Sequence, residues 1–242
     1  MAIGPENRAQ PRPYTHTIDQ VAVDAGLRAY MLRVYNYMAS GLALTGIVAY
    51  IVANTPSIAQ VVFSSPLIWI VILAPLGFVF FLSMRIHKMS AAAAQTTFWL
   101  YSAVMGLSLA SILMAFTGAS VARVFFITGG TFAAMSLYGY TTKRDLSRFG
   151  AFLFMGLIGL ILATLVNFFV GSSAVQFAIS VIGVLVFTGL TAWDTQRIKE
   201  TYLESDDSDS MTKKAVLGAL TLYLDFINLF VMLMQLLGVR RD

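Results

Sequence analysis

The sequence predicts an all-α integral membrane protein, a bundle of seven transmembrane helices with a cytoplasmic N-terminus. Composition is the first reason: of the 242 residues, 58% are hydrophobic and 12% are charged, and the mean hydropathy is +0.77. Soluble domains carry about 25% charged residues, so this chain lacks the polar residues that would cover a water-facing surface. The other two reasons are the spacing of its apolar stretches and the distribution of its basic residues.

Seven apolar stretches are long enough to cross the hydrocarbon core of a bilayer, which takes about 20 residues of helix. Turn residues such as Pro56, Pro66 and Gly171 separate the stretches from one another. The expected spans lie near residues 34–54, 66–84, 91–115, 121–141, 149–170, 174–195 and 214–238.

Basic residues are concentrated on one side of the expected bundle. With the N-terminus in the cytoplasm, thirteen Lys and Arg residues fall inside, and only Arg123, Arg240 and Arg241 fall outside. This asymmetry predicts the orientation by the positive-inside rule. An odd number of spans places Arg240 and Arg241 outside, so six spans with one re-entrant segment are the alternative. The basic residues are scattered through short loops, so we expect no nucleic-acid partner.

Residues 1–30 are expected to form a partly disordered cytoplasmic arm ahead of a membrane domain over residues 31–242. The arm contains Pro11 and Pro13 and no apolar stretch, which argues against a cleavable signal peptide. We expect residues 1–13 to be disordered and the amphipathic stretch 21–32 to lie on the membrane surface. Cysteine is absent, so the sequence offers neither a disulfide nor a thiolate metal site.

Two acidic residues, Asp194 and Asp225, interrupt apolar segments, whereas the other ten lie in tails or cytoplasmic loops. An Asp at the centre of a spanning helix costs about 2.5–3.5 kcal/mol on insertion scales, so such a residue usually faces a cavity, has a partner or is protonated. The two residues lie on consecutive antiparallel helices. They reach the same depth if the sixth segment continues to about Tyr202; if that segment stops at Asp194, they do not meet.

Asp225 belongs to a polar stripe on the last helix. The stripe residues are three or four positions apart and therefore share one face; they are Gly218, Thr221, Asp225, Asn228 and Met232. For Gly218, Thr221 and Asn228, helix packing explains the stripe, because small and hydrogen-bonding residues bring neighbouring helices together. For the two carboxylates it does not, because Asn or Ser would serve without the cost of ionisation. We therefore expect Asp194 and Asp225 to form a functional pair, with Thr221 and Asn228 as the polar stripe that supports it.

Two carboxyl groups within hydrogen-bonding distance cannot both ionise easily, so we expect Asp194 and Asp225 to share a proton and to sense pH. A nearby cation would favour the ionised form. Arg85, at the cytoplasmic end of the second segment, is the candidate for such a latch. The alternative for Arg85 is an interfacial position, with its side chain extended to the membrane surface beside His87 and Lys88.

The second half of the sequence contains three distinctive stretches: "GYTTKRDLSRFGAFLFMGLIG", "GVLVFTGLTAWDTQRIK" and "LYLDFINLF". They closely resemble the transmembrane Bax inhibitor-1 family, in particular the bacterial branch that includes the YccA and YetJ proteins. The resemblance runs from about the second segment to the end. It implies a fold in which the last helix is central and wrapped by the others, and a pH-sensitive calcium leak controlled by an aspartate pair. Asp194 and Asp225 match that pair by motif position, and Arg85 matches the latching arginine.

We expect a calcium leak channel of the bacterial inner membrane, with Ca²⁺ as the permeant ion at Asp194 and Asp225 and no permanently bound cofactor. Its partners would be the lipid bilayer, calcium ions and protons. The same carboxylates would also serve an H⁺/Ca²⁺ exchanger. A third possibility is a regulator of an FtsH-type membrane protease, because the YccA branch of the family resembles a modulator of such a protease.

No enzyme activity is expected, because the Gly-x-Gly-Asp motif of intramembrane aspartyl proteases is missing and both histidines lie outside the spans. The acidic loop 204–210 departs from shorter relatives. We interpret it as a solvated linker, because it has no glycine for a calcium-binding turn.

Overall fold

The computed structural model describes residues 14–64 and 66–241. Nearly all of this part is helical. The helices are α1 (Tyr14–Ala53), α2 (Pro56–Phe63), α3 (Leu67–Arg85), α4 (Ala91–Ala115), α5 (Gly118–Thr141), α6 (Ser147–Val170), α7 (Ser173–Glu200) and α8 (Ser208–Leu237), with a short 3-10 turn η1 (Ile86–Lys88) after α3. All of them except α2 and η1 are long and apolar enough to cross a membrane, which gives seven candidate spans in the described residues. The predicted all-α bundle of seven spans is confirmed.

Local sequence signals mark the helix ends. Ser90 and Thr117 begin α4 and α5, and the side chain of each accepts a hydrogen bond from the backbone N–H three residues later. Gly171 ends α6 with a φ of 65°, a conformation that a residue without a Cβ adopts at no steric cost. The expected loop at 55–65 contains the short helix α2, which begins at Pro56, where the missing N–H is no loss.

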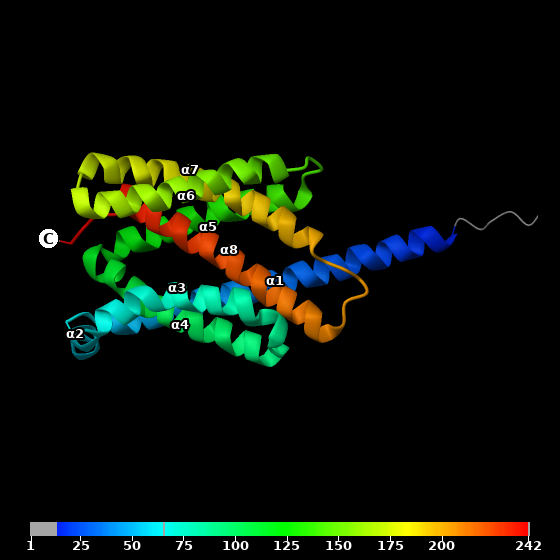
Figure 1. Cartoon of the computed structure of the whole chain (residues 1–242), viewed down its shortest axis with the longest axis horizontal. Helices are drawn as coiled ribbons and strands as arrows, with labels where there is room; N and C mark the ends of the chain where they lie inside the picture. The colour runs from blue at the N-terminus through cyan, green and yellow to red at the C-terminus, as the bar shows by residue number, and fades with distance from the viewer. Residues whose placement is uncertain (1–13, 65, 242) are drawn as a thin grey trace, which may run out of the picture.

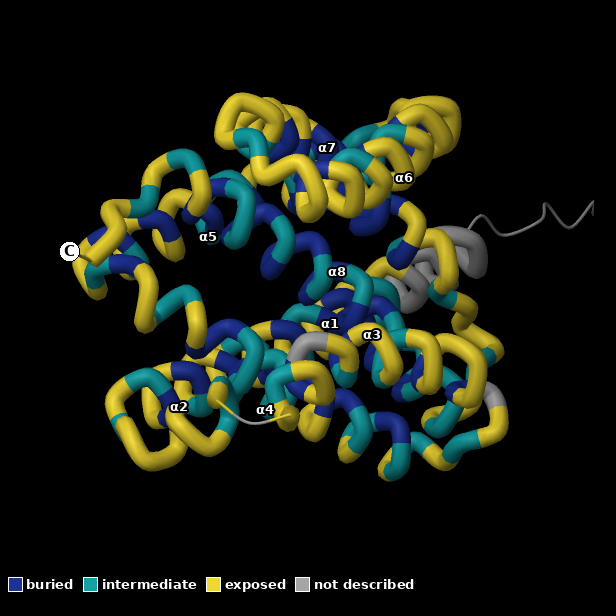
Figure 2. Tube along the Cα trace, turned by 60° about the vertical axis from the view of Figure 1, so that its left-hand side comes forward, coloured by how far each residue is buried: buried dark blue, intermediate teal, exposed yellow. Residues whose placement is uncertain are grey.

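The last helix lies at the centre of the bundle. Figure 1 shows α5, α6 and α7 on one side and α1, α3 and α4 on the other, with α8 crossing diagonally between them. In the most apolar 18-residue window of α8, 67% of residues are buried, against 17–44% in the other spans. The contrast is visible in Figure 2, where α8 is mostly dark blue and the outer faces of the surrounding helices are exposed. The expected central last helix is therefore confirmed.

The exposed outer faces carry large apolar side chains, as a lipid environment requires. Phe126, Phe168 and Phe169 are each at least 75% exposed. Since seven spans are odd in number, the described ends of the chain lie at opposite ends of the bundle (Figure 1). The cytoplasmic position of the N-terminus stays a prediction.

Most of the expected N-terminal arm belongs to α1. Residues 14–30 are helical and continue without a break into the first span, and this includes the stretch 21–32 that was expected on the membrane surface. The hydroxyls of Tyr30 and Thr201 are hydrogen-bonded at 3.1 Å, and the backbone of Gly26 lies against the Tyr202 side chain. These contacts attach the beginning of α1 to the end of α7. Residues 1–13, expected to be disordered, lie outside the described residues.

Candidate functional site

Asp194 and Asp225 lie in one cavity of about 580 Å³. Its walls come from α6, α7 and α8, with Leu76 of α3 at one side. The two carboxyl groups are within hydrogen-bonding reach of each other, and the residues are only 8% and 5% exposed. The Oδ2 atom of Asp225 has no hydrogen-bond partner among the described residues. The structure thus brings together two carboxyl groups that are 31 positions apart in the sequence.

The length of α7 allows the pair to meet. The apolar part of the sixth segment ends near residue 195, but the helix continues to Glu200, close to Tyr202, the end point expected if the pair is to meet. Arg197 and Lys199 favour this extension, because basic residues in the last turn stabilise the helix C-terminus. Arg197 also lies over the Trp193 ring, 5.4 Å from its centroid. Helix α8 passes diagonally across the bundle, so that Asp225, about 25 Å from its start, reaches the level of Asp194.

The motif around Asp194 is fixed on both flanks. The Gln196 side chain accepts a hydrogen bond from the Leu146 N–H at 2.9 Å and donates one to the Arg144 carbonyl at 2.9 Å. It therefore attaches the α5–α6 loop to α7. On the other flank, the Trp193 ring lies against Gly150 of α6, where a Cβ atom would overlap it. Asp194 is held between these two contacts.

The polar stripe of α8 divides into two parts. Thr221, Asn228 and Met232 line the cavity beside Asp225, whereas Gly218 packs against Ile198 of α7. The Thr221 hydroxyl donates to the Leu217 carbonyl at 3.1 Å, and the Asn228 side-chain N–H donates to the Leu224 carbonyl at 2.9 Å. The Thr221 donor and one of the two Asn228 donors are therefore used within the helix. The lone pairs of the Thr221 hydroxyl and the Asn228 amide oxygen remain as acceptors, beside two carboxylates.

Arg197 is the basic residue that lines the cavity, and its charge acts on Asp194. Sequence reasoning missed it, although its position three residues after Asp194 puts both on one helix face. Arg85 ends α3, about 14 Å along the helix from Leu76. It is exposed, and neither ion pair of the described residues involves it. Its role as a latch stays a prediction.

The acidic loop before α8 has structural contacts. Asp206 pairs with Lys214 at 2.6 Å and Asp209 with Lys213 at 2.9 Å. Asp207 begins α8, and hydrogen bonds from Ser210 lower the pKa of its carboxyl group. The described residues contain no group of three or more His, Cys, Asp or Glu that could hold a metal ion. The two cavity carboxylates with their neutral oxygen neighbours therefore offer a cation only a few protein ligands.

Comparison with known proteins identifies the family. The family model described as inhibitor of apoptosis-promoting Bax1 matches residues 27–242. The chain belongs to the Bax inhibitor-1 family. Inner membrane protein YbhL of Escherichia coli is 50% identical over 220 residues, covering 90% of this chain and 94% of YbhL. The protein RP147 of Rickettsia prowazekii is 48% identical and covers 94% of this chain and 97% of its own length.

A Caulobacter vibrioides relative is 42% identical, with 98% of both chains covered. The similarity to these bacterial members of the Bax inhibitor-1 family extends over almost the whole chain. With seven apolar helices, it identifies a multi-pass protein of the bacterial inner membrane. The resemblance noted in the motifs around Asp194 and Asp225 is confirmed at the level of the family.

Proposed function

We propose that this protein is a pH-sensitive calcium leak channel, in which Asp194 and Asp225 sense protons and form part of the ion pathway. The observation that carries the proposal is the meeting of the two carboxyl groups in a cavity inside the membrane bundle. Buried carboxylates are costly in a membrane and are typical of ion and proton pathways. Two helices that pack together need no carboxylates for that purpose.

The contact between the carboxyl groups supports proton sensing. Two carboxyl groups at this distance share a proton more readily than both ionise, and their titration belongs to the pair. Full ionisation requires a compensating cation. Arg197 at the rim supplies a positive charge, and a permeant cation can supply more. Protons and cations therefore compete for the same two side chains, and this competition makes permeation depend on pH.

The choice of calcium rests on ligand chemistry and on the family resemblance. Carboxylate, hydroxyl and amide oxygens suit a hard cation such as Ca²⁺, and the lining supplies all three through the pair, Thr221 and Asn228. Ca²⁺ prefers six to eight oxygen ligands, so this site would hold it weakly, as conduction requires. The proposal includes no permanently bound cofactor and no enzyme activity.

The test is calcium flux into proteoliposomes between pH 6 and pH 8. Wild type should leak calcium with a pH dependence that Asp194→Asn and Asp225→Asn flatten. Asp145→Asn, which changes an exposed carboxylate between α5 and α6, should keep the wild-type profile. Flux at the level of empty liposomes throughout would exclude the channel. Calcium moved uphill by an imposed proton gradient would instead establish the H⁺/Ca²⁺ exchanger.

A regulator of a membrane protease makes the opposite prediction. It would need the N-terminal arm and would be indifferent to both aspartates. A chain lacking residues 1–20 should therefore keep its calcium leak if the channel proposal holds. Substrate turnover by a co-reconstituted FtsH-type protease that depends on residues 1–20, without any leak, would support regulation.

A further inference from the structure

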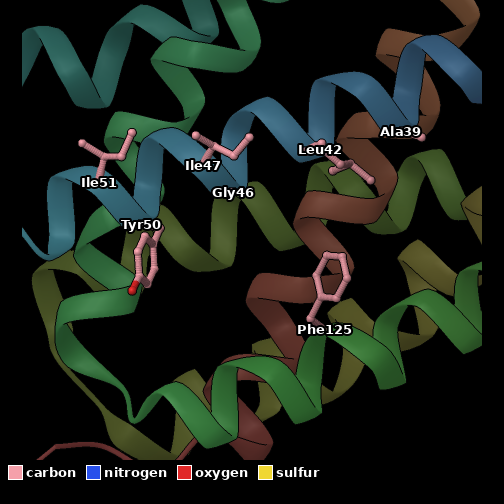
Figure 3. Close-up of a pocket in the computed structure, with 8 residues that line it drawn as sticks. Ala39, Leu42, Gly46, Ile47, Tyr50, Ile51 and Phe125 are labelled. Carbon is pink, nitrogen blue, oxygen red and sulfur yellow. The ribbon is translucent and has the colours of Figure 1, made fainter.

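The structure contains an apolar groove on the side of the bundle opposite the aspartate cavity, between α1 and α5. Its first part begins at Arg28 and ends at Ala39 along α1, and Phe132, Ala133 and Tyr140 face it from α5. A second part continues from Ala39 to Ile51, with Phe125 on the α5 side. Figure 3 shows this second part, with Leu42, Tyr50 and Phe125 at its edges.

Each part of the groove has about the length of one leaflet of a bilayer. Arg28 and Ala39 are eleven residues apart, or about 16 Å at a rise of 1.5 Å per residue. Half of a hydrocarbon core of about 30 Å is 15 Å. The two parts share Ala39, which lies near the middle of the candidate span Asp24–Ala53. The first part has the length of an acyl chain that starts at the surface beside Arg28.

The wall of the first part is apolar because its hydroxyl groups bind one another. The Thr195 hydroxyl donates to the Thr191 carbonyl at 2.7 Å and so accepts from Ser136 at 3.0 Å. Ser136 in turn accepts from the Tyr35 hydroxyl at 2.7 Å. This chain connects α1, α5 and α7 across the groove floor. It leaves methyl, methylene and ring surface facing outward, which suits an acyl chain and does not suit water.

The two ends of the groove differ in charge. Arg28, at the mouth of the first part, is exposed and has no ion pair or hydrogen bond among the described residues. Close by, Lys199 donates to the Tyr140 carbonyl at 2.9 Å. The lining of the second part includes no charged residue. A phosphate group would therefore meet a free guanidinium at one end of the groove only.

We propose that the first part of the groove is a binding site for one anionic phospholipid, with an acyl chain between α1 and α5 and its phosphate at Arg28. The unpaired charge at the mouth and the length of one leaflet carry this assignment. A guanidinium binds a phosphate through two parallel hydrogen bonds. The hydroxyl chain at the floor ends on the residue next to Asp194, so an occupied groove would also hold α7 in its present position.

The test compares phosphatidylglycerol with phosphatidylcholine on the purified full chain in detergent, by native mass spectrometry of retained lipid. Wild type should retain one phosphatidylglycerol, and Arg28→Gln should weaken this binding by about fivefold. Ala133→Phe fills the groove and should abolish retention. The matched controls are Ala134→Phe, exposed next to Ala133 but outside the groove, and Arg123→Gln at the other end of α5. Both should bind as wild type does.

Three outcomes would overturn the proposal: equal retention of the two lipids by wild type, retention unchanged in Ala133→Phe, or equal losses in the two phenylalanine variants. Inorganic phosphate forms a separate arm, read as a shift in melting temperature. Phosphate alone should give no shift, because the acyl chain supplies the groove contact. If inorganic phosphate raised the melting temperature as much as phosphatidylglycerol does, the site would bind a free anion, and the proposal of a lipid site would be overturned.

Discussion

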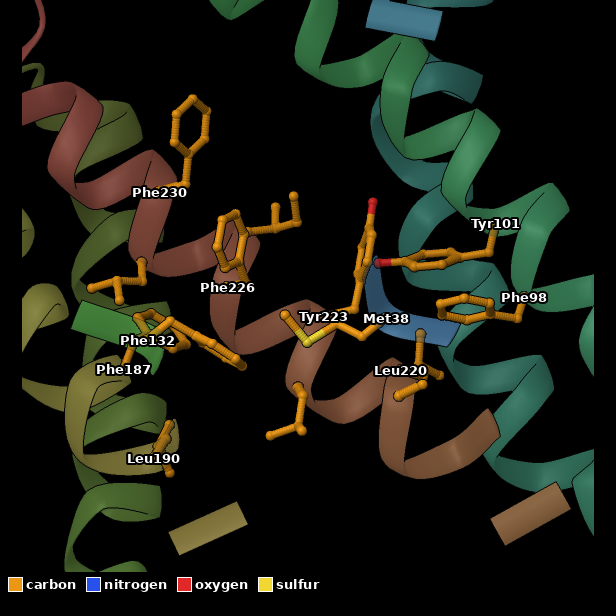
Figure 4. Packing of buried hydrophobic residues seen from close by; sticks show 14 of the residues in the cluster. Met38, Phe98, Tyr101, Phe132, Phe187, Leu190, Leu220, Tyr223, Phe226 and Phe230 are labelled. Carbon is orange, nitrogen blue, oxygen red and sulfur yellow. The ribbon is translucent and has the colours of Figure 1, made fainter. Parts of the chain in front are cut away.

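Two sides of α8, defined by Tyr223 and Asp225, handle buried polar groups in opposite ways. The Tyr223 hydroxyl donates to Thr45 of α1 at 2.6 Å, and the Thr45 hydroxyl donates to the Ser102 carbonyl of α4 at 2.8 Å. Tyr223 also packs edge-on with Phe98 and Tyr101, at centroid distances of 6.0 and 5.5 Å. Figure 4 shows Tyr101 pointing its hydroxyl at the Tyr223 ring. On this side, which we call the packed side, the Tyr223 and Thr45 hydroxyls join helices, and the Tyr101 hydroxyl, which has no hydrogen-bond partner among the described residues, is enclosed by aromatic rings.

Asp225, two residues further on, faces a cavity, where the Asp194 carboxyl group of α7 is its neighbour. Its Oδ2 atom lacks a hydrogen bond, and the Thr221 hydroxyl and one of the two Asn228 side-chain N–H groups donate within α8. On this side, the cavity side, carboxylate oxygens face open space. The difference teaches that free space and unused acceptors, and not polarity alone, separate the candidate site from ordinary helix packing in this bundle. Four predictions test this contrast.

The largest effect is expected from Tyr223→Ala on the packed side. Removing a fully buried aromatic ring costs about 3 kcal/mol of unfolding free energy, the low end for such truncations, because in a bilayer packing is lost without transfer from water. Equilibrium unfolding of the purified protein in mixed detergent measures it. Leu224→Ala, on the cavity side, should cost less. Equal losses of unfolding free energy in the two variants would contradict the distinction between the packed side and the cavity side.

A pair of glycines provides a matched test of space. A Cβ on Gly106 of α4 would lie 2.7 Å from the Thr45 carbonyl oxygen and 2.8 Å from Val48 Cβ. The Thr45 carbonyl belongs to the helix backbone and cannot move aside as a side chain can, so Gly106→Ala should destabilise the protein by about 2 kcal/mol. A Cβ on Gly183 of α7 would meet only the flexible Met232 side chain, at 2.8 Å. Since Met232 borders the cavity, Gly183→Ala should be nearly neutral in the same unfolding assay.

Removing one polar partner on each side should lower stability on the packed side only. Thr45→Val leaves the Tyr223 hydroxyl buried without an acceptor and should cost about 1 kcal/mol, as interhelical hydrogen bonds in membranes do. Asp225→Asn removes the cost of a buried carboxylate and should leave the unfolding free energy unchanged or raise it. A large loss of stability in Asp225→Asn would mean that the aspartate joins helices and would place it with the packed side.

The smallest effect concerns Asp207, at the start of α8 and outside both sides. Hydrogen bonds from Ser210 lower its pKa in the folded protein, so its stabilisation is fully present above the unfolded value of about 3.9 and is lost as pH falls through the lower folded value. Asp207→Ala should therefore reduce the melting temperature slightly at pH 7, with the difference vanishing in acid. Asp207→Asn, a cap that does not titrate, is the control.

The same Asp207 variants sharpen the contrast with the cavity. Because Asp207 titrates well below pH 6, neither variant should change the pH profile of calcium flux between pH 6 and pH 8. A changed profile would mean that the loop carboxylates, and not the cavity pair, respond to protons in that range.

Much of this protein follows from sequence alone. Apolar stretches of membrane-spanning length predicted seven helices, because backbone groups in lipid must be satisfied within each segment. The stretches containing Asp194 and Asp225 predicted the family, and the cost of burying a carboxylate in a membrane marked these two residues as unusual. Local patterns leave the end of the sixth segment open between Asp194 and about Tyr202, and the structure decides it: α7 ends at Glu200, because basic residues at a helix C-terminus favour a helix that hydropathy alone would end.

Only the tertiary structure decided which polar residues face space. Helical spacing put Gly218 and Thr221 on one stripe, yet Gly218 packs on Ile198 while Thr221 lines the cavity, because α8 crosses its neighbours at an angle and one face meets different helices along its length. Arg197, and not Arg85, lies at the cavity for the same reason. The groove at Arg28 depends on residues of α1 and α5 that are about a hundred positions apart. Such juxtapositions arise from the packing of distant segments, and a local pattern of apolar and polar residues does not predict which segments pack together.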